Sequence, residues 1–512
     1  MKVLFRIVSC LLFASMAWAA ERPNVLFIAV DDLRPELACY GKSYIKSPNI
    51  DRIAKAGIRF NHAYCQQAVC SPSRSSLMTG TRPDTTRVWD LVTHFRQALP
   101  DVVTLGQHFK QNGYFVQGMG KIYHGGYDDP VTWSVPWQTP KAVMYALPEN
   151  VALNQRRLEG EPDGTPAERK GGRKQDRSAQ GAPSSNRDTR GPAFEGADVP
   201  DNTFQDGKVA ELAVSTLRDL SGKKEPFFLA VGFIKPHLPF VAPKKYWNLY
   251  DPSRIQLAPN KFRPTDAPDY AIVPGGEMRA YHGIPEGSIP DDLARQLKHG
   301  YYAAVSYMDA QVGKVLDELD RLGLRKNTIV VLWGDHGWKL GEHDAWCKHT
   351  ACENDTNAPL LLSVPGMKNA GAGTDALVEF VDIYPTLCEL AGLPLPAHLE
   401  GTSFKPLLED PGRPWKTAAF SQYPRNPGQT KAGALMGYSM RTSRYRFTVW
   451  VGREDHSKVE AVELYDHQAD PQENTNIARQ PAQAERVKSL MEQWRRGWQG
   501  ARPGAAATAA AR

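Results

Sequence analysis

Four short runs of hydrophobic residues recur along the chain, and each ends in charged or imidazole side chains. Such runs, rich in β-branched and aromatic residues, are typical of strands buried on both faces of a parallel sheet. They cover residues 23–30, 114–120, 226–234 and 328–333, and the groups that follow them are Asp31-Asp32, Lys121 to His124, Lys235-Pro236-His237 and Asp335-His336. Because ligands of open α/β sheets bind outside the carboxyl ends of the strands, we expect these side chains to form one site.

Predicted helices separate these strands. They cover residues 48–54, 104–113, 204–220, 293–324, 381–390 and 482–498. The alternation of strands and helices predicts an α/β fold with a large, mostly parallel sheet. Short strands within residues 414–470 precede the last helix, which we expect to pack on them.

The first 20 residues have the features of a secretory signal. Lys2 and Arg6 precede a short hydrophobic run, and Ala17-Trp18-Ala19 has the pattern of a cleavage site. The run is too short to span a bilayer, and no later stretch is long enough. We therefore expect export to the periplasm or the extracellular space, or to the lysosome in a eukaryote, without a membrane span.

In the 512-residue chain, composition distinguishes an insertion and a C-terminal tail from the predicted domains. Residues 155–195 are rich in Gly, Pro, Ser, Arg and Glu and poor in hydrophobic residues, which predicts a mobile surface insertion. The Ala-rich tail at 501–512 is expected to be disordered. We place a catalytic domain at 21–390 and a C-terminal subdomain at 391–500.

The net charge bears on the possible binding partners, and the cysteines bear on disulfides and zinc binding. The net charge of +6 is small for this length and suits an anionic substrate as well as an ordinary surface excess; we expect no nucleic-acid partner. Beyond the signal there are six cysteines, and an exported protein can form disulfides. Cys347 and Cys352 are the nearest candidate pair, and no Cys-x-x-Cys zinc pattern occurs.

Asp31 and Asp32 suggest a metal ion. Two adjacent carboxylates at the end of a buried strand are costly unless a cation neutralises them. A turn that caps a helix is the alternative, and the second acidic strand end, at Asp335, favours the metal.

The segment Cys70-Ser71-Pro72-Ser73-Arg74, followed by a short hydrophobic helix and Thr79-Gly80, resembles the signature of the sulfatase family. Pro72 is tolerated in the first turn of a helix, so residue 70 is expected to face free backbone N–H groups that suit an anionic sulfate. An ordinary free or disulfide-bonded cysteine before a helix is the alternative for so short a pattern.

Further segments resemble the iduronate-2-sulfatase group of that family, and the likeness runs from about residue 22 to about residue 475 outside the insertion. They are Asp31 to Pro35, Gln66 to Cys70, Arg82 to Arg87, Lys235 to Phe240, Gly334 to His343, Ser421 to Arg425 and Met436 to Ser439. The resemblance implies the alkaline-phosphatase-like fold, with a smaller C-terminal α/β domain that contains an antiparallel sheet.

The resemblance also implies the chemistry. A formylglycine-generating enzyme would convert Cys70 to formylglycine, whose hydrated form attacks the sulfur of a sulfate ester and then releases sulfate by elimination. One Ca²⁺ ion would be held by Asp31, Asp32, Asp335 and His336 together with the converted residue 70. Calcium rarely takes a nitrogen ligand, so Mg²⁺ and Mn²⁺ are chemical alternatives.

The remaining site residues are assigned by the same resemblance. Arg74 and Lys121 would hold the diol and sulfate oxygens, and His124 would take the diol proton. His237 and Lys348 would bind sulfate beside the leaving oxygen, with His237 a candidate general acid. Lys235 would add positive charge, and Trp338 would either face the sugar or belong to the core.

These features predict an exported sulfatase that removes 2-O-sulfate from uronic acids of glycosaminoglycan-type or algal oligosaccharides. His349 follows Lys348 where the iduronate-2-sulfatase group has tyrosine, which leaves contacts beyond the sulfate open. The alternatives are a phosphonate monoester or phosphodiester hydrolase of the same superfamily and a non-catalytic carbohydrate-binding homologue.

Overall fold

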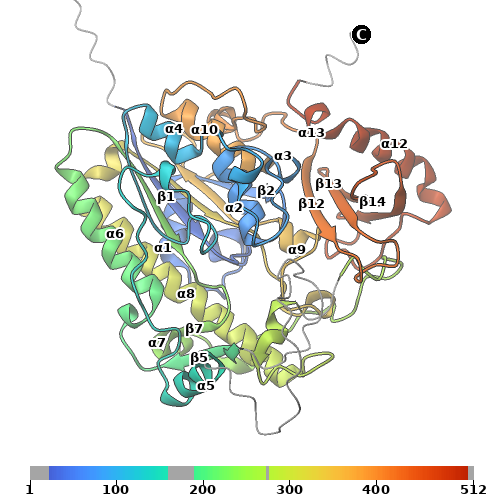
Figure 1. Ribbon diagram of the computed structural model, residues 1–512, viewed down its shortest axis with the longest axis horizontal. Helices are drawn as coiled ribbons and strands as arrows, with labels where there is room; N and C mark the ends of the chain where they lie inside the picture. Colours follow the sequence, from blue (N-terminus) through green and yellow to red (C-terminus); the bar gives the residue numbers. More distant parts are fainter. Residues whose placement is uncertain (1–21, 159–189, 273–275, 505–512) are drawn as a thin grey trace, which may run out of the picture.

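A seven-stranded sheet forms the centre of the larger domain and lies between two layers of helices (Figure 1). The computed structural model describes residues 22–158, 190–272 and 276–504. The strand order is β11-β2-β10-β9-β1-β6-β3, and only β10 runs antiparallel to its neighbours. The strands are β1 (Asn24–Val30), β2 (Ile58–Tyr64), β3 (Phe115–Gly120), β6 (Phe227–Phe233), β9 (Thr328–Gly334), β10 (Leu360–Ser363) and β11 (Gly373–Glu379). The predicted α/β fold with a mostly parallel sheet is confirmed.

Alternate residues of the continuously hydrophobic β1 serve the two helical layers. Leu26 and Ile28 belong to the hydrophobic core on one side, and Val25 and Phe27 to the core on the other. The first layer contains α1 (Pro48–Ala56), α6 (Gln205–Ser221) and α8 (Asp291–Arg321); the second contains α2 (Cys70–Thr79), α4 (Leu105–Gln111), α10 (Ile383–Leu390) and α11 (Lys405–Glu409). Burial on both faces explains why the strand lacks a polar alternation.

A four-stranded antiparallel sheet forms the C-terminal part, as the sequence resemblance implied. Helix α12 (Ala484–Arg495) packs on it through Leu490. The strands, in order, are β12 (Ala419–Arg425), β13 (Leu435–Arg441), β14 (Tyr445–Gly452) and β15 (Val459–Asp466). Leu407 of α11 still belongs to the core of the large sheet, so the first domain continues beyond the predicted boundary at residue 390.

Short elements complete the fold, and some of them lie inside the predicted insertion. They are α3 (Pro83–Thr86), α5 (Pro148–Leu158), β4 (Arg190–Pro192), β5 (Phe194–Ala197), β7 (Phe240–Pro243), α7 (Lys244–Trp247), β8 (Tyr281–His282), α9 (Glu353–Thr356) and α13 (Gly497–Gly500). The expectation of a mobile insertion at 155–195 was therefore too wide, because α5 occupies its start and β4 and β5 pair with β8 and β7. Residues 159–189, the predicted signal at 1–20 and the tail from 505 lie outside the described residues.

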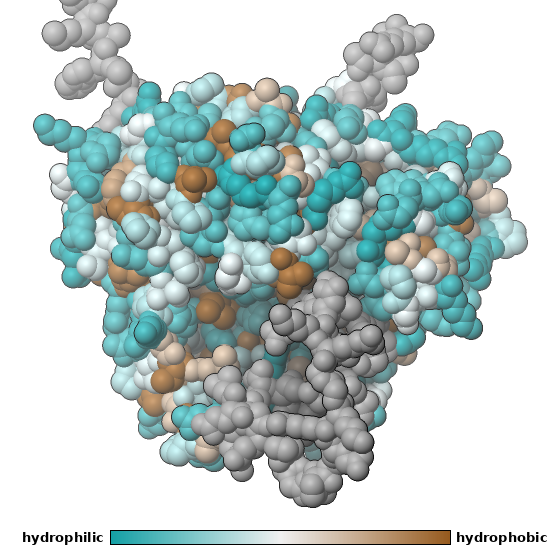
Figure 2. Space-filling view, in the orientation of Figure 1, coloured by the Kyte–Doolittle hydropathy of each residue, from teal (hydrophilic) through white to brown (hydrophobic). Residues whose placement is uncertain are grey.

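The cysteines and the surface add two observations. All six cysteines within the described residues are free, so the candidate pair of Cys347 and Cys352 is not bridged. On the face shown in Figure 2, hydrophilic side chains predominate and hydrophobic ones are scattered. In the part of the chain that the structure describes, no helix is long and apolar enough to cross a membrane.

A buried ion-pair cluster joins the two domains at the end of β11. The carboxylate of Glu379 accepts hydrogen bonds from Arg82 at 2.8 and 2.9 Å and from Lys416 at 2.7 Å. It also accepts the backbone N–H of Phe420 at 2.9 Å, where the C-terminal sheet begins. Although burial raises the pKa of a carboxyl, Arg82 and Lys416 hold the pKa of Glu379 at about 2.

We expect Glu379→Gln to lower the free energy of unfolding by about 3–5 kcal/mol, because it leaves the buried Arg82 without this counter-ion and Lys416 with Asp382 alone. The pKa of Glu379 is below its ordinary value of 4.5, so its ion pairs stabilise the fold above about pH 4.5 and are lost as pH falls towards 2. Denaturant unfolding at several pH values measures both effects. Asp317→Asn, which removes an exposed pair with Arg52, is the control and should cost less than ~1 kcal/mol. An equal loss in both variants would contradict this interpretation.

Candidate active site

Four neighbouring strands bring the predicted side chains to one edge of the sheet. β9, β1, β6 and β3 are consecutive and parallel, so their carboxyl ends lie together. Asp31 and Asp32 follow β1, Lys121 follows β3, and Asp335 follows β9. Each comes directly after a buried strand, so the structure brings these side chains together as the sequence predicted.

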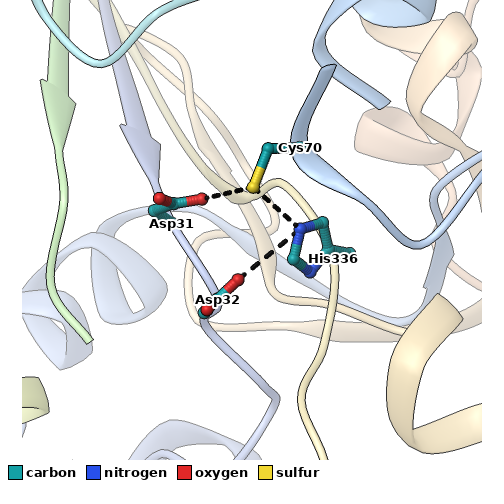
Figure 3. A group of neighbouring side chains, drawn as sticks. All are labelled: Asp31, Asp32, Cys70 and His336. Atoms are coloured by element: carbon teal, nitrogen blue, oxygen red, sulfur yellow. Dashed lines mark hydrogen bonds and ion pairs between the residues drawn. The ribbon is translucent and has the colours of Figure 1, made fainter. Parts of the chain in front are cut away.

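Cys70 begins helix α2, and its sulfur lies between the ends of β1 and β9 (Figure 3). The Sγ atom is 3.2 Å from Asp31 Oδ1, 3.4 Å from His336 Nε2 and 3.7 Å from Lys121 Nζ. The side chain is only 2% exposed. Burial and the negative charge of Asp31 raise the pKa of the Cys70 thiol well above its ordinary value, unlike the environment of a reactive thiolate.

The donor set around Cys70 fits a cation. Ligand atoms of Asp31, Asp32, Cys70 and His336 lie within 4.8 Å of one another, and all four residues are buried. The Nδ1 atom of His336 is 2.9 Å from the Gly337 carbonyl oxygen, which can accept only if Nδ1 carries the hydrogen. The Nε2 lone pair then faces Asp32 and Asp335, whose Oδ1 atoms lie 3.6 and 3.5 Å away, as an imidazole ligand requires. Burial raises the pKa of Asp32 and Asp31 adds to that effect, whereas a bound cation would favour both carboxylates.

Arg74 and Asp335 hold the site together. Arg74 is fully buried; its Nε donates to Asp335 Oδ2 at 2.9 Å, and a terminal nitrogen lies 3.3 Å from Asp31 Oδ1. It also donates to the backbone carbonyls of Lys121 and Ile122. The other Asp335 oxygen accepts the Asp32 N–H at 3.0 Å. These contacts fix the relative position of three strand ends.

Lys121 and His124 follow β3 on the same side. The Lys121 ammonium donates to Asp31 Oδ2, which holds the positive charge beside Cys70. Burial and the charge of Lys121 lower the pKa of His124 to about 3, so this imidazole is neutral near pH 7. Its Nδ1 has no hydrogen-bond partner among the described residues.

Lys348 and His237 both lie beside Asp32. The Lys348 ammonium donates to Asp32 at 2.9 and 3.1 Å. His237 Nε2 lies 3.9 Å from Asp32 Oδ2, and its Nδ1 is 2.6 Å from the Leu238 carbonyl oxygen. Burial lowers the pKa of His237 to about 4, so donation from Nε2 requires a nearby anion that favours the imidazolium.

Glu277 and Arg190 are site residues that the sequence analysis missed. Glu277 accepts a hydrogen bond from Lys348 at 3.0 Å and one from Arg190 at 2.7 Å, and it lies 3.6 Å from His237 Nε2. Neither residue follows a predicted strand, and Arg190 falls inside the predicted insertion. Only the abundance of cations near the site signalled that a further carboxylate was needed.

Two expected substrate contacts point elsewhere. Trp338 is fully buried, with the Lys348 ammonium 4.8 Å from its ring centroid, so it belongs to the core and not to a sugar-facing wall. The Lys235 ammonium donates to the carbonyls of His237 at 2.9 Å and Pro239 at 2.6 Å, and burial lowers its pKa to about 8. In this structure Lys235 shapes the loop that carries His237.

The family model "Sulfatase" matches residues 23–393, and a second model, "N-sulphoglucosamine sulphohydrolase, C-terminal", matches residues 341–498. The chain therefore belongs to the sulfatase family of sulfuric ester hydrolases. Iduronate 2-sulfatase of Mus musculus is 36% identical to this chain, over 90% of the chain and 91% of the relative.

Solved structures share the fold at lower identity. A structure described as a 2-O GAG sulfatase superimposes with a TM-score of 0.67 at 22% identity, covering 93% of this chain and 92% of the other. A phosphonate monoester hydrolase from Silicibacter pomeroyi gives a TM-score of 0.69 at 22% identity, covering 94% and 96%. The shared fold therefore does not separate sulfate from phosphonate chemistry.

Proposed function

We propose that this enzyme removes 2-O-sulfate from uronic acid residues of glycosaminoglycan-type or algal oligosaccharides, using formylglycine at position 70 and one bound Ca²⁺. The observation that carries the proposal is the convergence of the Cys-x-Pro-x-Arg residue, two aspartates and His336 in one buried cluster. The substrate class rests on the identity to iduronate 2-sulfatase over nine-tenths of both chains. Export through the segment 1–20 and maturation by a formylglycine-generating enzyme belong to the same proposal.

The chain's own residues supply binding and proton transfer. When present, the hydrated formyl group provides the nucleophilic hydroxyl and the cation stabilises negative charge on the sulfate. Asp31, Asp32, His336 and the adjacent Asp335 would hold the cation. Lys121 and Lys348 place fixed positive charges beside residue 70, and they stabilise an anion without reorganisation.

Two histidines carry the proton transfers in this proposal. His124 is neutral near pH 7 and can accept a proton at its unpartnered Nδ1. His237 donates from Nε2 to the leaving oxygen once the sulfate has stabilised its imidazolium form. Arg74 donates hydrogen bonds to Asp335, Asp31 and two backbone carbonyls, so in this proposal it also positions the two aspartates around residue 70.

The substrate assignment predicts a preference among matched disaccharides. A non-reducing-end 2-O-sulfated uronate should be hydrolysed with at least ~10-fold higher kcat/KM than the same sugar with its carboxylate reduced or a 6-O-sulfated hexosamine. Steady-state kinetics with the three compounds measures this. Preference for either of the last two would reject the uronate assignment and leave the sulfatase assignment intact.

Phosphodiester hydrolysis is the rival activity, because a phosphonate monoester hydrolase shares this fold. Turnover of an aryl sulfate is compared with that of an aryl phosphodiester. We expect a preference for the sulfate, because iduronate 2-sulfatase is 36% identical to this chain over 90% of the chain and 91% of the relative. Faster phosphodiester turnover would favour the rival.

A further inference from the structure

Glu277 contacts both groups assigned to the sulfate. One carboxylate oxygen accepts from Lys348 Nζ at 3.0 Å, and the other lies 3.6 Å from His237 Nε2. Its side chain is 15% exposed. Although burial raises the pKa of a carboxyl, the charges of Lys348, His237 and Arg190 hold the pKa of Glu277 well below its ordinary value. An anion bound by Lys348 and His237 therefore meets a full negative charge that contacts the same two groups.

Arg190 partners the outer side of this carboxylate. Its guanidinium donates to Glu277 Oε1 at 2.7 Å and lies 5.3 Å from the ring centroid of Tyr281. The pairing of β4 with β8 sets Arg190 opposite Tyr281 and so fixes its distance from Glu277. The Arg190 side chain is 37% exposed, so the pair extends from the buried Lys348 to the surface.

These residues form an ion-pair network and not a second cation site. Ligand atoms of Asp32, His237 and Glu277 lie within 4.8 Å of one another, which by distance alone would allow a metal. The Lys348 ammonium, however, is bonded to both carboxylates and already supplies the positive charge between them. Glu277 thus affects anion binding at Lys348 because its negative charge partly neutralises the Lys348 ammonium.

We propose that Glu277 is a specificity-determining residue that weakens the binding of free inorganic sulfate by His237 and Lys348, and that Arg190 sets the strength of this effect. The inference rests on the proposed function, in which His237 and Lys348 bind the sulfate group. A sulfate ester carries one negative charge and the released sulfate carries two, so repulsion by Glu277 acts more strongly on the product. The carboxylate therefore favours product release over substrate loss.

The two halves of the pair should shift sulfate affinity in opposite directions. Glu277→Gln should lower the Kd of inorganic sulfate by ~10-fold, and Arg190→Gln, which leaves Glu277 without its outer partner, should raise it by ~3-fold or more. KM for the sulfate ester should change less than the Kd of sulfate in both variants. Isothermal titration calorimetry with sodium sulfate measures Kd, and product inhibition of turnover gives an independent value.

Glu318→Gln is the matched control, because Glu318 forms comparable ion pairs with Arg218 and Arg321 on the helical layer. It should leave sulfate affinity unchanged. Unchanged or weaker sulfate binding in Glu277→Gln would overturn the inference, since a merely structural carboxylate weakens the site when removed. A different outcome would overturn the proposed function instead. In that outcome the two variants show the predicted changes in sulfate Kd, but the wild-type enzyme hydrolyses no sulfate ester.

Discussion

Replacing Cys70 with alanine is expected to reduce sulfate-ester turnover by on the order of 10⁴-fold or more, because the residue supplies the nucleophile in the proposed chemistry. In the active wild-type enzyme, the peptide 60–74 released by trypsin should weigh about 18 Da less than its cysteine form, since a thiol has become an aldehyde. Mass spectrometry and steady-state kinetics on the same preparations measure both. The variant should still fold, because cysteine and alanine are both small and the site is held by Arg74 and Asp335.

The chain offers a matched control in the same peptide. Cys65 is also buried, and its sulfur lies 3.9 Å from the Asp355 carbonyl oxygen, away from the aspartate pair. Cys65→Ala should keep both the loss of about 18 Da and most of the activity. Near-normal turnover in Cys70→Ala, or full wild-type activity with residue 70 still a thiol, would end the formylglycine assignment.

If the proposed cation is bound, its removal should lower turnover by roughly 10³-fold, which corresponds to the several kcal/mol that a metal contributes to transition-state charge stabilisation. Asp31→Asn should lose metal and activity together, because a carboxylate that faces Cys70 and Lys121 becomes neutral. Elemental analysis and kinetics before and after prolonged chelation, followed by addition of Ca²⁺, Mg²⁺ or Mn²⁺, measure the effect. The chelation must be prolonged because all four cluster residues are buried.

Two variants sharpen the metal experiment. Asp309→Asn alters a buried carboxylate that accepts the N–H of Ile50 at 2.7 Å, and it should lower stability without changing metal content. His336→Asn replaces a nitrogen donor with an oxygen donor, so it should retain Ca²⁺, whereas loss of the ion would indicate a metal that prefers nitrogen. Full activity in an enzyme shown to be metal-free would contradict the site assignment.

The sequence by itself predicted four of the seven strands of the large sheet, β1, β3, β6 and β9, and the polar residues that follow them; it did not predict β2, β10 or β11. Residues 25–30 and 329–333 are continuously hydrophobic because both faces of these strands are covered, and such runs can be found without knowing the partner strand. The polar residues directly after them, at Asp31 and Asp335, then mark the carboxyl edge. The Cys70 motif added the chemistry, because its local pattern places the residue at a helix start.

Only the tertiary structure decided which charges meet. Lys348 and Asp32 are 316 positions apart, and Lys348 and Glu277 are 71 apart, so no local pattern records either contact. The sequence analysis assigned Lys121 and Lys348 to the sulfate, whereas in the structure Asp31, Asp32 and Glu277 already balance their charges within the protein. Trp338 likewise belongs to the core, because its side chain is buried and the Lys348 ammonium lies 4.8 Å from its ring centroid. Hydrophobic periodicity reports that a residue is buried, but the energy of a buried charge depends on its partner, and partners are set by the fold.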